Sequence, residues 1–142
     1  MIAILRLSIV VVVLTCFTSC VPATSYELLN NTDSLVEITW GSSVYLAAPK
    51  TITPIFGSAT TPLTIKSEKI VWRYAEPPFF IHWEKGSWHD SYITQRFPSG
   101  YIVRIQLEPD GKIYALKKTD SFPINAPTPQ PGPFPMSPLS TN

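Results

Sequence analysis

The residues of this chain best suited to covalent chemistry are Cys16 and Cys20, which stand four positions apart near the N-terminus. A thiol can form a disulfide, ligate a metal or carry a covalently attached lipid. No cysteine follows Cys20, so the rest of the chain offers neither a disulfide framework nor a thiolate metal site. We therefore expect the folded domain to be held together by its hydrophobic core.

Both cysteines lie at the end of an apolar run that extends from Leu7 to Ser19 and follows Arg6. This run of thirteen residues is shorter than the roughly 20 residues that a membrane-spanning helix needs. Its length and its small residues at the end are typical of a secretory signal peptide. We predict that residues 1–19 are a signal peptide and that Cys16 is discarded with it.

The tetrapeptide Phe17-Thr18-Ser19-Cys20 resembles a lipobox, the sequence before which the bacterial lipoprotein signal peptidase cuts. Thr18, Ser19 and Cys20 match the pattern, whereas Phe17 stands where an aliphatic residue is usual. The resemblance implies that Cys20 becomes the first mature residue and carries a diacylglycerol thioether and an acylated amine. Each buried methylene of these chains contributes about 0.8 kcal/mol to membrane attachment. In enteric-type lipoproteins, a residue other than aspartate at position 21 favours the outer membrane, and Val21 fits that pattern.

Two other interpretations of the N-terminus compete with the lipoprotein. Val21-Pro22-Ala23 resembles a small-x-small cleavage site, which would give a soluble mature chain starting at Thr24. Alternatively, the first twenty or so residues remain as an uncleaved anchor, with Arg6 reaching the membrane interface.

A second group of chemically capable residues comprises His82, Glu84, His89 and Asp90. Two imidazoles and a carboxylate suit zinc by residue type. Their spacing matches no established zinc motif such as His-Glu-x-x-His, and side chains on a half-exposed strand explain His82 and Glu84 equally well. We expect no metal and no cofactor.

Composition and motifs argue against catalysis and against nucleic-acid binding. Eleven Lys and Arg residues nearly balance ten Asp and Glu residues, so no basic stripe is available for phosphates. The sequence contains neither a Gly-x-Ser-x-Gly elbow nor a phosphate-binding glycine loop. We expect a protein that is not an enzyme and does not bind nucleic acid.

Aromatic residues are concentrated just after the middle of the chain. The five candidates for contact with a glycan or a protein partner are Phe79, Phe80, Trp83, Trp88 and Tyr92. Exposed aromatic side chains make strong contacts with such ligands. The alternative is that they form a small second cluster that covers the open end of the domain.

Alternation of apolar and polar residues is the main structural signal between residues 26 and 118. It is clearest in LVEITW (35–40), KIVWRY (69–74) and YIVRIQLE (101–108), in which Arg104 and Gln106 are predicted to face outward. These runs are rich in β-branched and aromatic residues, as strands are. The predicted core residues are Trp40, Trp72, Tyr74, Val103 and Ile105.

Turn residues separate these runs. Asn30-Asn31-Thr32-Asp33-Ser34 divides YELL (26–29) from LVEITW, and Glu108-Pro109-Asp110-Gly111-Lys112 predicts a hairpin in which Gly111 takes the left-handed position. We predict an all-β fold, a small antiparallel β-sandwich of about seven strands with immunoglobulin-like architecture, over residues 26–118. Residues 20–25 are predicted to be a lipid-anchored tether.

The C-terminal segment, residues 119–142, is rich in proline, with seven prolines among the last twenty-one residues. Proline lacks the backbone donor that ladders and helices require, so we predict an extended, disordered tail. A sharper interpretation is that the tail is a ligand for an aromatic-lined groove on a partner.

Together these features predict a small cell-envelope lipoprotein, held through Cys20 to the outer membrane and facing the periplasm. Its sandwich would serve as a structural or protein-interaction module with an envelope protein as partner. The alternative is a soluble periplasmic or secreted binding domain that uses its aromatic residues on a glycan or peptide.

Overall fold

The structure is a computed structural model that describes residues 23–57, 61–75, 92–97, 100–123, 130 and 134–142. These residues form ten strands and no helix, where the sequence predicts about seven strands. The strands are β1 (Ala23–Asn30), β2 (Val36–Trp40), β3 (Ser43–Ala47), β4 (Ile52–Ile55), β5 (Leu63–Lys66), β6 (Val71–Tyr74), β7 (Ile93–Phe97), β8 (Gly100–Leu107), β9 (Ile113–Leu116) and β10 (Ser140–Thr141).

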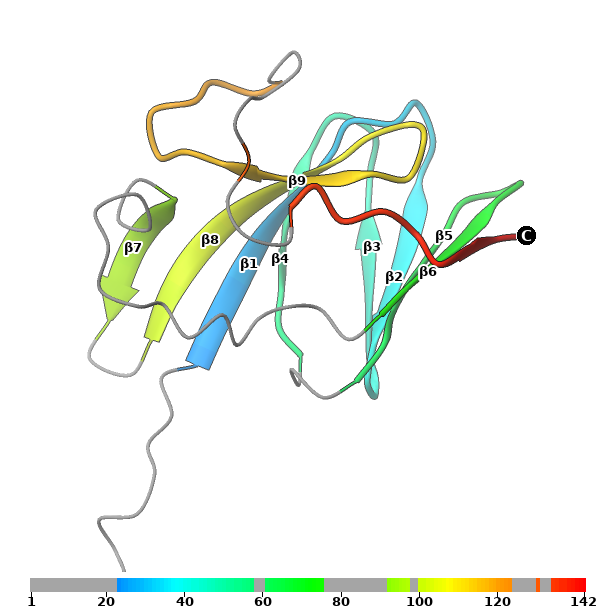
Figure 1. The fold of residues 1–142 in the computed structure, drawn as a ribbon, viewed down its shortest axis with the longest axis horizontal. Coiled ribbons are helices and arrows are strands. Elements are labelled where there is room, and N and C mark those ends of the chain that lie inside the picture. The colour runs from blue at the N-terminus through cyan, green and yellow to red at the C-terminus, as the bar shows by residue number, and fades with distance from the viewer. Residues whose placement is uncertain (1–22, 58–60, 76–91, 98–99, 124–129, 131–133) are drawn as a thin grey trace, which may run out of the picture.

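One sheet, here called sheet A, contains β4, β1, β8, β7 and β9 (Figure 1). β1 lies inside this sheet, antiparallel to β4 and parallel to β8, so the N-terminal strand is paired along both sides. β7 pairs with the first half of β8 and β9 pairs with its second half. Pro54 lies in β4, the edge strand, where its missing backbone donor removes no ladder bond.

The other sheet, sheet B, is antiparallel throughout, with the order β10-β6-β5-β2-β3. In β2, Val36, Ile38 and Trp40 are buried while Glu37 is exposed, as the alternation in LVEITW predicts. Gly41 begins the tight turn from β2 to β3 and has a positive φ of 61°, which glycine adopts without strain.

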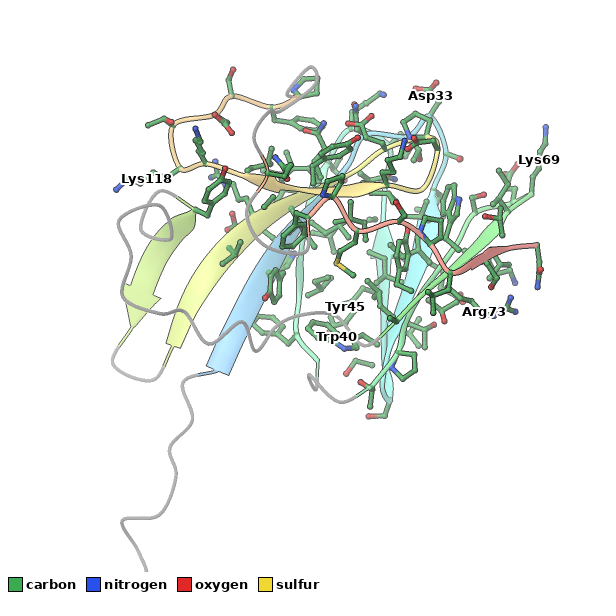
Figure 2. All side chains as sticks on the ribbon, in the orientation of Figure 1. Asp33, Trp40, Tyr45, Lys69, Arg73 and Lys118 are labelled. Atoms are coloured by element: carbon green, nitrogen blue, oxygen red, sulfur yellow. The ribbon has the colours of Figure 1, made fainter. Side chains whose placement is uncertain are left out.

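The two sheets pack face to face around one hydrophobic core, which gives a β-sandwich-like all-β fold (Figure 2). Side chains of both sheets meet there, and the Tyr26 and Trp40 rings make an edge-to-face contact with centroids 6.0 Å apart. All five predicted core residues are at most 3% exposed, which confirms those predictions: Trp40, Trp72, Tyr74, Val103 and Ile105.

The outer face of sheet A departs from the predicted pattern at Gln106. Alternation predicts a solvated side chain, but Gln106 is fully buried, and its amide donates a hydrogen bond to Glu108. Leu29 and Leu116 are also buried, although they alternate with the residues that face the core. Sheet A therefore buries side chains on both faces. The hydrogen bond to Glu108 supplies the partner that the buried Gln106 amide needs.

The predicted hairpin between β8 and β9 is confirmed. The Gly111 amide donates to the Glu108 carbonyl at 2.9 Å, and the Glu108 amide donates to the Lys112 carbonyl at 2.8 Å. Gly111 has a φ of 81°, and a Cβ at this position would overlap the indole of Trp72. Glycine is thus required both by the backbone conformation and by the packing.

The end of the chain differs from the disordered tail that the sequence predicts. The Met136 amide and carbonyl both bond to Ile113 of β9, and Met136 is only 8% exposed. Ser140 and Thr141 form β10, which pairs with the edge of β6. The segment 134–142 therefore joins the edges of both sheets. Its residues other than proline have backbone groups that can hydrogen-bond, and these pair with β9 and β6.

Candidate functional site

Cys20 lies outside the described residues, as do Phe17, Thr18 and Ser19 of the lipobox-like tetrapeptide. The described chain begins at Ala23, so only Val21 and Pro22 separate Cys20 from β1. Residues 23–25, predicted to be part of a tether, are instead the first three residues of β1. Any attachment at Cys20 is therefore tied closely to the folded domain.

β1 determines where the N-terminal segment leaves the sandwich. Ala23 pairs with Gly100, so the start of β1 lies beside the start of the parallel strand β8 (Figure 1). Eight consecutive residue pairs between β1 and β8, together with four pairs between β1 and β4, hold this strand in place. The part of the chain that the structure describes contains no helix long and apolar enough to span a membrane.

The predicted aromatic contact residues fall mostly outside the described residues. This holds for Phe79, Phe80, Trp83 and Trp88, while Tyr92 is described and is only 4% exposed. Burial raises the pKa of the Tyr92 phenol, and the nearby Asp120 carboxylate raises it further. Tyr92 is thus a packed side chain with little surface to offer a ligand.

The residues considered for a metal site, His82, Glu84, His89 and Asp90, also lie outside the described residues. Within the described ranges, no group of three or more His, Cys, Asp or Glu side chains is arranged to hold a metal ion.

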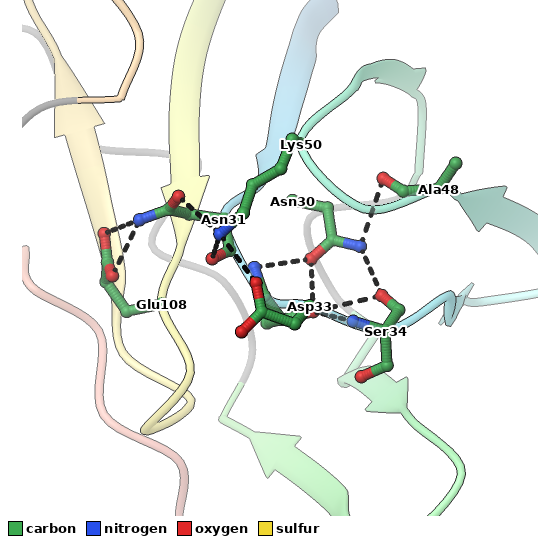
Figure 3. A network of polar contacts seen from close by, with 8 residues as sticks. Asn30, Asn31, Asp33, Ser34, Ala48, Lys50 and Glu108 are labelled. Carbon is green, nitrogen blue, oxygen red and sulfur yellow. Dashed lines mark hydrogen bonds and ion pairs between the residues drawn. The ribbon is translucent and has the colours of Figure 1, made fainter.

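The most extensive polar cluster that the structure describes is centred on Asn30, at the end of β1 (Figure 3). Asn30 is fully buried. Its amide nitrogen donates to the carbonyls of Ser34, Ala47 and Ala48 at 2.9, 2.9 and 3.2 Å. Its amide oxygen accepts from the backbone and the hydroxyl of Thr32 at 3.0 and 2.7 Å. One side chain thereby joins the β1–β2 turn to the end of β3.

Asn31 extends this cluster to the third turn at the same end of the molecule (Figure 3). Its amide nitrogen donates to both carboxylate oxygens of Glu108, and its carbonyl accepts from Lys50 Nζ at 2.7 Å. Lys50 also lies 3.1 Å from Asp33 and has a positive φ of 58°. The donors and acceptors in this cluster bond to one another, so the cluster acts to fasten three turns together.

Sequence reasoning identified 30–34 as a turn but missed its connection to Lys50 and Glu108. The signal that pointed to it is the pair Asn30-Asn31, because asparagine amides readily hydrogen-bond nearby backbone groups. Lys50 and Glu108 lie 19 and 77 residues from Asn31 in the chain, and no local pattern reveals them.

The described residues define an all-β, sandwich-like domain. Comparison of the chain with family models, with curated proteins and with solved structures finds no match.

Proposed function

We propose that the protein is a small cell-envelope lipoprotein in which acylated Cys20 holds the β-sandwich to a membrane. The resemblance of Phe17-Thr18-Ser19-Cys20 to a lipobox carries this proposal. Val21, rather than aspartate, follows the cysteine, and we place the protein on the outer membrane facing the periplasm for this reason.

The start of the fold supports cleavage before Cys20. That cleavage leaves β1 complete, because β1 begins at Ala23. Cleavage after Ala23, the alternative for a secreted protein, would remove the residue that pairs with Gly100 at the end of the β1–β8 register. A mature chain that begins at Cys20 retains every backbone pair of its first strand.

We also propose that the sandwich is a structural or protein-interaction module for an envelope partner. An edge of sheet B supports this proposal. β3 is the last strand of that sheet, and its outward side chains Val44 and Leu46 are 59% and 62% exposed. An edge strand that carries exposed apolar side chains suits the addition of a strand from another protein.

Immunoglobulin-like architecture is part of the same proposal. It is supported by two largely antiparallel sheets that share one core containing a buried tryptophan, Trp40. The disulfide of antibody domains has no counterpart here, since the chain has no cysteine after Cys20.

Metabolic labelling with an alkyne analogue of palmitate tests the anchor directly. Wild-type protein is expected to take up the label, and Cys20→Ala is expected to lose it. The matched control is Cys16→Ala, which removes the neighbouring thiol and is expected to label like wild type. Unlabelled wild-type protein, or label retained in Cys20→Ala, would refute the lipoprotein function.

A further inference from the structure

The described residues at the two ends of the sandwich differ in charge. One end, here called the charged end, is formed by turns 31–35, 48–51, 67–70 and 108–112. Each of these turns carries ionisable side chains, namely Asp33, Lys50, Glu68, Lys69, Glu108, Asp110 and Lys112. Figure 2 shows Asp33 and Lys69 at this end, far from Trp40.

At the opposite end, the described residues 23–25, 41–43, 56–57 and 61–62 are here called the uncharged end. The strand registers bring these segments together, because Trp40 pairs with both Ser43 and Leu63, and Tyr26 pairs with Ile55. The segments contain only Ala, Thr, Ser, Gly, Phe and Pro, with no ionisable side chain.

Phe56 is presented to solvent at the uncharged end. Phe56 is 54% exposed. Its backbone is held on both sides by Tyr45, whose hydroxyl donates to the Phe56 carbonyl at 2.6 Å and accepts from the Phe56 amide at 3.1 Å. An exposed aromatic side chain beside uncharged residues suits the boundary between headgroups and acyl chains, where aromatic residues gather in membrane proteins.

The length of the intervening chain places this end near the anchor. Cys20 and Ala23 are three peptide units apart, so their Cα atoms are at most about 11 Å from each other. β1 then runs away from that point for eight residues, or about 26 Å, toward the charged end. A lipid on Cys20 would hold the uncharged end, and not the charged end, at the membrane.

We propose that the uncharged end of the sandwich rests on the lipid surface, with Phe56 in the interfacial region and the charged end turned away from the membrane. This inference depends on the proposed lipidation of Cys20. Among the described residues of this end there is no carboxylate for an anionic headgroup layer to repel.

Depth-dependent quenching in vesicles tests this orientation on the lipidated mature protein. The chain has no cysteine after Cys20, and acylation consumes the Cys20 thiol, so one introduced cysteine provides one site for a thiol-reactive fluorophore. The reporter is Phe56→Cys, and Ser42→Cys is a second reporter at the same end. The matched control is Leu35→Cys at the charged end, where the native residue is 51% exposed. The vesicles contain phosphatidylethanolamine and phosphatidylglycerol with brominated acyl chains.

The fluorophores at positions 42 and 56 are expected to be quenched severalfold more strongly than the fluorophore at position 35. Equal quenching at the two ends, or stronger quenching at position 35, on protein whose mass includes the acyl chains would overturn the orientation and leave the lipoprotein function intact. A mass that shows an unmodified Cys20 in wild-type protein would overturn the proposed function, and with it the orientation. A protein partner covering the uncharged end would appear as weak quenching at all three positions, which also counts against the proposal.

Discussion

The Tyr74 hydroxyl donates a hydrogen bond of 2.5 Å to the carbonyl of Gly111, which joins sheet B to the β8–β9 hairpin of sheet A. Tyr74 is only 2% exposed, and Gly111 is buried against the neighbouring Trp72. Because the contact links residues 37 positions apart across the core, it reports on the docking of the two sheets.

Replacing Tyr74 by Phe is expected to lower the free energy of unfolding by about 1–2 kcal/mol, because the Gly111 carbonyl loses a buried donor while the ring is retained. Urea unfolding followed by tryptophan fluorescence measures this change. Tyr114→Phe is the matched control, since Tyr114 is only partly buried in β9. A loss no larger in Tyr74→Phe than in the control would contradict the assigned role of this hydrogen bond.

The same tyrosine predicts a decline of stability in alkali. Burial, and secondarily the Asp110 carboxylate, raise the pKa of Tyr74 well above its ordinary value of 10.0. The stabilising effect of the neutral phenol is complete below about pH 10 and is lost as the pH rises toward the folded-state pKa, because only the unfolded chain ionises in that window. Unfolding curves between pH 9 and 11 should therefore show a smaller decline for Tyr74→Phe than for wild type.

Asn30 should be the most sensitive residue of the turn cluster. Asn30→Ala removes the donor of the Ser34, Ala47 and Ala48 carbonyls and is expected to cost at least about 2 kcal/mol, because a buried group left unpaired costs about 1–3 kcal/mol. Asn31→Ala is the control, because Asn31 is less buried, and its expected cost is under about 1 kcal/mol. Similar losses in the two variants, measured by chemical unfolding, would disprove this ranking.

Met136 should anchor the C-terminal segment. Met136→Ala opens space in the core and is expected to cost about 2 kcal/mol or more. Leu139→Ala, in the same segment but 74% exposed, is expected to change stability by less than about 0.5 kcal/mol. Thermal unfolding of the two variants compares them, and limited proteolysis shows whether the segment detaches. An unchanged midpoint in Met136→Ala would mean that the segment does not contribute to the core.

The Asp110–Lys112 ion pair in the hairpin should make a small, pH-dependent contribution. The hydrogen bond from Lys112 lowers the pKa of the Asp110 carboxyl below its ordinary value of 3.8. The stabilising effect is therefore present above about pH 4 and is lost as the pH falls through the lowered pKa. The stability difference between wild type and Asp110→Asn should vanish at low pH. A difference that stays constant from neutral pH to pH 2 would have another origin.

Local patterns predicted the strands best where one face is buried and the other is solvated. In β2, alternation correctly placed Val36, Ile38 and Trp40 in the core and Glu37 on the exposed face. The same rule wrongly placed Gln106 of β8 in solvent. Alternation can only distinguish a solvated face from a buried one, and sheet A buries side chains on both faces.

Composition was a poor guide to the C-terminal segment. Proline content predicted disorder, but β10 and Met136 need only a few backbone donors to pair with β6 and β9, and the residues between the prolines supply them. Whether such a segment docks depends on free strand edges elsewhere in the chain, which no local composition records.

The sequence by itself determined the all-β class, the main core residues and the turn at Gly111, because each depends on neighbouring residues. Only the tertiary structure decided the parallel pairing of β1 with β8 and the burial of Asn30. Those features depend on contacts between residues far apart in the chain, and such contacts form only when the two sheets close over a common core.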